Sequence, residues 1–86
     1  MQFQCAVMKE QGFVFAVIKV KEQVVRNSFE AMTTRRVFQT VFTGLPIVLM
    51  AQEAGGRVLY DGREDIVGLL SDMPSAAIPL RHYTVT

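Results

Sequence analysis

The amino-acid sequence predicts one α+β domain spanning residues 1–86, built as a two-layer sandwich of two helices on an antiparallel or mixed sheet of four to five strands. Three observations predict it. The length of 86 residues is that of one domain with one core. Half of the residues are hydrophobic and 20% are charged, which is too apolar for a disordered chain. Strand patterns and two segments of helical periodicity follow one another in the order ββαββαβ.

The first two strands are expected to form a hairpin. Gln2 to Lys9 alternates loosely between apolar and polar residues, as a half-buried strand does. Gly12 can adopt the positive φ that a tight hairpin needs. The segment from Phe13 to Lys21, FVFAVIKVK, is apolar on both faces in its first part, which is typical of a central strand covered on both sides. A continuation through Val24 and Val25, past a bulge, also fits the pattern.

A helix is expected to begin at Asn27. This side chain can accept a hydrogen bond from the helix N-terminus, and Glu30 stands at the spacing of a capping box. Threonines and valines are frequent in the segment, so tertiary packing must hold the helix. Gly44 can end it in a left-handed conformation. The stripe expected to face the sheet comprises Ala31, Thr34, Val37, Phe38, Val41, Phe42 and Leu45.

The second half is expected to repeat this plan. Pro46 to Gln52, PIVLMAQ, is a second strand apolar on both faces, and a Gly-rich turn leads into an antiparallel strand from Arg57 to Tyr60. Asp61 is expected to cap the next helix, with Glu64 at capping-box spacing. The apolar residues of that helix recur at helical spacing; they are Ile66, Leu69, Leu70 and Met73. A last strand is expected from Leu80 to Val85.

Composition argues against several chemistries. The net charge of +1 gives no electrostatic reason to expect nucleic acid or an anionic membrane as a partner. One cysteine, Cys5, and one histidine, His82, argue against an internal disulfide, a Cys-rich metal site or a zinc site, so no cofactor is expected. The N-terminus lacks the pattern of a signal peptide, and the longest apolar run is short of a membrane span. A cytoplasmic protein is therefore expected.

The segment GFVFAVI, from Gly12 to Ile18, resembles the aromatic signature of the RNA-recognition motif. In that family, alternate aromatic residues on a central strand stack on bases. The resemblance would assign this role to Phe13 and Phe15. The context differs, because the family's strand follows a β-α-β unit and here one strand precedes it. An ordinary apolar sheet is the competing interpretation.

Two further resemblances concern the second half of the chain. Leu45 to Met73 resembles the C-terminal half of a thioredoxin-like domain, with a proline at a strand start, a hairpin and a helix. Redox chemistry in that family needs a cysteine pair, and this chain has only Cys5. The combination of PIVLMAQ, YDGREDIV and IPLRHYTV resembles small bacterial conserved hypothetical proteins, including products of mobile integron gene cassettes. This resemblance implies a bacterial origin and transfers no functional residues.

The sequence contains no catalytic motif and leaves three functions open. The first is a non-enzymatic module that self-associates as a homodimer and can bind a further protein partner. The second is a small-molecule site or minor enzyme with a pocket between sheet and helices, near Tyr60, Arg63 and His82. The third and weakest is RNA binding. The predicted interface comprises Phe13, Phe15, Val17, Phe29 and Met32.

The homodimer is expected because two helices on one face of the sheet would leave the other face uncovered. Soluble monomers seldom expose so large an apolar patch, and a second copy can cover it, by its own sheet face or by pairing along an edge. The alternative places one helix on each face and leaves both half covered.

Overall fold

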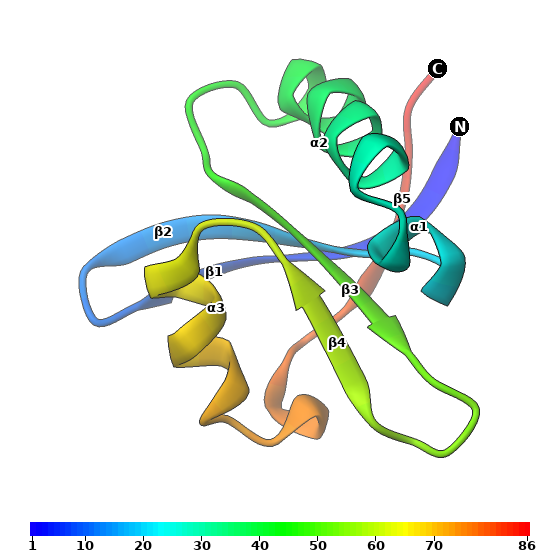
Figure 1. The fold of residues 1–86 in the computed structure, drawn as a ribbon. Coiled ribbons are helices and arrows are strands. Elements are labelled where there is room, and N and C mark those ends of the chain that lie inside the picture. The colour runs from blue at the N-terminus through cyan, green and yellow to red at the C-terminus, as the bar shows by residue number, and fades with distance from the viewer.

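A computed structural model describes all residues, 1–86, as a five-stranded sheet with helices on both sides (Figure 1). In chain order the elements are β1 (Gln2–Glu10), β2 (Phe13–Lys19), α1 (Glu22–Arg26), α2 (Ser28–Val41), β3 (Ile47–Gln52), β4 (Val58–Asp61), α3 (Glu64–Ser71), a 3-10 turn η1 (Ser75–Ala77) and β5 (Arg81–Thr84). No helix is both long and apolar enough to cross a membrane.

The strands lie in the order β4-β3-β2-β1-β5. The β1–β2, β3–β4 and β1–β5 pairs are antiparallel, and β2 runs parallel to β3. The predicted α+β class, the mixed five-stranded sheet and the two main helices are therefore confirmed. Strands from both ends of the chain share this one sheet, because β5 returns to pair with β1.

The two main helices lie on opposite faces of the sheet, and each covers its own core (Figure 1). On the α3 face, Phe15 and Val17 pack with Ile66 and Leu70 of the helix. On the α2 face, Ala16 and Ile18 of the same strand belong to the core that includes Phe38. The expectation that both helices share one face is wrong, and the alternative with one helix on each face holds.

The central position of β2 and β3 was predicted correctly from their apolar character. Residues 15 to 18 and 47 to 51 are all buried. A strand with neighbours on both edges and a helix over each face has no surface left for polar side chains. The apolar pattern thus correctly indicated that both faces of these strands are covered. The covering segments are helices of the same chain.

Three predicted backbone features are confirmed. The β1–β2 hairpin turns through Gln11 and Gly12, whose φ angles are 48° and 85°. The Asn27 side chain accepts a 3.0 Å hydrogen bond from the Glu30 backbone N–H at the start of α2. Gly44, which follows α2, has a φ of 84°. Positive φ at these turns explains why glycine is used there.

Two local predictions are wrong. Val24 and Val25 do not extend β2, because they lie in the short helix α1, where they pack against the α2-side core. Asp61 does not cap α3, since that helix begins at Glu64 and has no side-chain cap. Asp61 ends β4 instead, and its carboxylate accepts a hydrogen bond from Arg35 of α2. The long-range ion pair replaces the predicted local cap.

Candidate functional site

The predicted ligand pocket is not assembled in the structure. Tyr60 lies in β4 and His82 in β5, and these strands form opposite edges of the sheet with three strands between them. His82 is exposed and lies within 3.4 Å of the Gln4 side-chain nitrogen. Arg63, just before α3, is the one of the three that borders a larger pocket. Tyr60, Arg63 and His82 therefore do not converge on one ligand.

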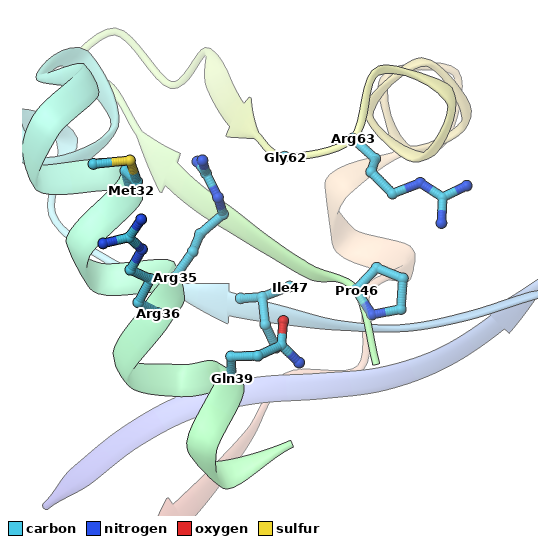
Figure 2. A pocket seen from close by; sticks show the side chains of 8 residues that line it. All are labelled: Met32, Arg35, Arg36, Gln39, Pro46, Ile47, Gly62 and Arg63. Carbon is cyan, nitrogen blue, oxygen red and sulfur yellow. The ribbon is translucent and has the colours of Figure 1, made fainter. Parts of the chain in front are cut away.

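The larger pocket is an open groove of about 530 Å³ between α2 and the corner that follows β4 (Figure 2). We call it the α2 groove; it is lined by Met32, Arg35, Arg36, Gln39, Pro46, Ile47, Gly62 and Arg63. Its volume lies in the range of small-molecule sites, of order 300–1,000 Å³. Gly62 permits the close approach of the corner to β3, since a Cβ there would lie 3.0 Å from the Val48 side chain.

The charged groups of the α2 groove are mostly engaged within the chain. Arg35 forms an ion pair with Asp61. Figure 2 shows the Arg63 side chain directed away from the groove, where it pairs with Asp65 at 2.6 Å and lies over the Phe13 ring. This pairing lowers the pKa of the Asp65 carboxyl below its usual value. Arg36 is the one arginine of the groove that forms no ion pair within the chain, so an incoming anion would meet a single unpaired positive charge.

The predicted interface residues are not presented on one surface. Phe15 and Val17 are fully buried under α3, so neither can contact a second copy or stack on a base. Phe13 is half-buried beneath Arg63. Phe29 and Met32 are exposed on α2, at 71% and 37% of their surface, and Met32 borders the α2 groove. The predicted sheet-face interface is wrong, and the exposed α2 residues alone make a small patch.

The open edge of β4 forms a second groove of about 390 Å³, which we call the β4 edge groove. It is lined by Val25, Arg26, Arg57, Val58, Leu59, Tyr60, Val67 and Ser71. β4 is an edge strand of the sheet, and both α1 and α3 contribute residues to the groove beside it. Partial burial raises the pKa of the Tyr60 hydroxyl. This groove thus has a strand edge as its floor and a helix as each wall.

The side chains of β4 alternate between the two faces of the sheet. Val58 and Tyr60 pack against the core on the α3 face. Asp61, which pairs with Arg35 of α2, lies on the α2 face, and by alternation Leu59 lies there too. Val58, Leu59 and Tyr60 are all half-buried and uncharged. Edge strands are commonly protected by lysine, proline or a covering segment, and these three residues provide no such protection.

The free backbone groups of β4 can be assigned from its pairing with β3. In an antiparallel pair, residues alternate between those that face the partner strand and those that face away. The Glu53 N–H donates to the Arg57 carbonyl at 2.8 Å, so Arg57 faces β3, and by alternation Leu59 does too. The N–H and C=O groups of Val58 and Tyr60 therefore point outward at the open edge.

Sequence reasoning did not identify this edge as a functional surface. The segment RVLYD, from Arg57 to Asp61, contains the signal, because an apolar strand core stands between a positive and a negative residue. The pattern becomes meaningful only when β4 is known to be an edge strand. That position depends on β5 joining β1 at the far side of the sheet.

Cys5 is fully buried in the α2-side core, and burial raises the pKa of its thiol. We expect native protein to react with a thiol reagent far more slowly than urea-unfolded protein, because a shielded thiol forms little reactive thiolate. Labelling with a chromogenic disulfide reagent measures this directly. Rapid labelling of the native chain, at the rate of the unfolded one, would show that Cys5 is accessible.

No group of three or more His, Cys, Asp or Glu side chains is placed to hold a metal ion. Comparison of the chain with protein-family models, with curated proteins and with solved structures finds no match. The resemblance to bacterial conserved hypothetical proteins stays a prediction.

Proposed function

We propose that this protein is a non-enzymatic interaction module that self-associates as a homodimer through the open edge of β4. The observation that carries the proposal is an unprotected strand edge with free backbone groups and half-buried apolar side chains. Such an edge is a template for a further strand, because added main-chain hydrogen bonds satisfy the free N–H and C=O groups.

The alternative of a small-molecule site draws less support from the geometry. Tyr60 and His82 lie on opposite edges of the sheet, and Arg35 in the α2 groove is already paired with Asp61. A pocket of that kind would need a few polar groups that converge and are free to bind. The β4 edge groove combines unpaired backbone groups with walls that carry both valines and polar side chains, which suits a β-strand as its occupant.

Sedimentation equilibrium over micromolar concentrations tests the proposal. We expect the wild-type chain to approach twice its 9.6 kDa mass as concentration rises. Leu59→Lys should shift the chain to the monomer, because a lysine at an edge strand opposes pairing by desolvation and like-charge repulsion. A wild-type mass of one chain over the whole range would refute self-association.

Val14→Lys is the matched control. Val14 is also apolar and lies in a strand, with 42% of its surface exposed, but it is remote from the β4 edge because it pairs with Lys9 at the hairpin end. We expect Val14→Lys to dimerise like the wild type. If Val14→Lys dissociates the dimer and Leu59→Lys does not, the contact lies on the sheet surface near the hairpin.

A further inference from the structure

From the charges and pairing of RVLYD we infer the arrangement of the dimer: two copies of β4 pair antiparallel about a twofold axis at Leu59, which joins two sheets into one of ten strands. This inference rests on the proposed self-association and adds the partner, the strand direction and the register. The partner is a second copy of this chain, because the segment is complementary to its own reverse.

The backbone groups fit this register. The pairing is centred on Leu59. It places Val58 opposite Tyr60 of the second copy, and by symmetry Tyr60 opposite Val58 of the second copy. These are the two residues whose N–H and C=O groups point outward from β3. Each such pair exchanges two hydrogen bonds in an antiparallel ladder, so all four outward groups of each copy are satisfied. A shift by one residue would place each outward-facing residue opposite a residue whose N–H and C=O groups point toward its own β3, and these bonds would be lost.

The side chains also match. Val58 and Tyr60 make a β-branched and aromatic cross-strand pair on the α3 face, and the two Leu59 side chains meet on the α2 face. At the ends of the paired segment, Arg57 stands opposite Asp61 of the second copy, twice by symmetry. Arg57 is 81% exposed and its nearest carboxylate, Glu53, is 3.7 Å away, so it is free to reach a better partner. Asp61 pairs with Arg35 through Oδ2, which leaves Oδ1 for that contact.

On the α2 face, the helix beside the edge leaves room for the second copy. α1 packs on both β3 and β4, so its axis lies about half a strand spacing inside β4. Two copies related at the β4 edge then have their α1 helices about two strand spacings, roughly 10 Å, apart across the strands. That is the usual distance between packed helices, about 8–10 Å. The α1 helices of the two copies would therefore extend each other's layer on the α2 face.

Disulfide cross-linking tests the register. The two Leu59 residues form a non-hydrogen-bonded pair, with Cα atoms about 4.5 Å apart, so Leu59→Cys should give a covalent dimer on a non-reducing gel after mild oxidation. Val58→Cys is the matched control, because the two copies of residue 58 stand two residues apart along the strands. Their Cα atoms are then about 8 Å apart, beyond the ~7 Å limit for a disulfide. We expect at least tenfold slower cross-linking of Val58→Cys. Wild-type chain, with only buried Cys5, should not cross-link.

Charge exchange provides a second readout. Arg57→Asp and Asp61→Arg each replace two opposite-charge pairs by two like-charge pairs, so each variant alone should dimerise about tenfold or more weakly than the wild type. Mixing the two variants restores an opposite charge at both positions, and a heterodimer of near wild-type affinity should form. Thermal melts of each variant verify that the fold is retained, which matters most for Asp61→Arg because it loses the Arg35 pair.

The outcomes separate the register from the proposed function. A wild-type dimer in which Val58→Cys cross-links as fast as Leu59→Cys, or Leu59→Cys not at all, overturns the register and leaves self-association standing. A wild-type chain that stays monomeric at all concentrations overturns both. In that case, an extended segment of a different protein would still fit the β4 edge groove.

Discussion

Phe15→Glu is expected to leave the chain largely unfolded. Phe15 is fully buried in the α3-side core, which also contains Val17 and the helix residues Ile66 and Leu70. Loss of the ring costs about 3–5 kcal/mol, and a carboxyl group buried without partners adds about 1–3 kcal/mol even when protonated. A domain of this size has a total stability of about 4–13 kcal/mol. Circular dichroism and urea unfolding measure the result.

Lys19→Glu is the control, because Lys19 lies in the same strand and is exposed. We expect its unfolding midpoint to stay close to that of the wild type. The sheet-face interface predicted from sequence would have given the opposite result, a folded monomer for Phe15→Glu. A cooperative melt of Phe15→Glu near the wild-type midpoint would therefore argue against the observed placement of α3.

Phe38→Ala is expected to lower the free energy of unfolding by about 3–5 kcal/mol, the usual range for a buried aromatic residue. Phe38 is 7% exposed on the inner side of α2. Its ring meets that of Phe3 edge-on, with centroids 4.8 Å apart. Phe3 in turn stacks on Tyr83 at 5.9 Å, so the cavity would open beside the β1–β5 pair. Urea denaturation of both chains gives the difference.

Arg36→Ala is the matched change on the outer side of the same helix. Arg36 is exposed and forms no ion pair within the chain, so its removal should alter stability by no more than about 0.5 kcal/mol. If the two variants unfolded at the same urea concentration, the assignment of the inner and outer sides of α2 would be wrong.

The local elements of this fold could be predicted well because their signals are local. Gly12, Asn27 and Gly44 each mark a turn or a helix end through backbone chemistry that needs no distant residue. The apolar faces of β2 and β3 correctly indicated strands covered on both sides. α1 was missed, because a five-residue helix is too short to show periodicity and its valines suggest a strand.

The placement of elements could not be read from the same signals. The face that a helix covers is decided by tertiary packing, which places α3 opposite α2. The pairing of β5 with β1 rather than with β4 separates Tyr60 from His82. It also leaves β4 as an edge, so the proposed contact surface depends on a long-range pairing. Asp61 shows the same limit of local sequence signals, because it pairs with the distant Arg35 and does not form the predicted helix cap.

The alternation of β2 between two cores has a consequence for how the molecule loses its structure. Phe15 and Val17 belong to one core, and Ala16 and Ile18 belong to the other. Neither core can therefore melt while the other stays intact, because the loss of either core would expose one face of β2 to solvent. Amide hydrogens in β2 should exchange with solvent only when the whole chain opens, whereas the edge strands can fray independently. One strand thus makes two separate clusters behave as a single cooperative unit.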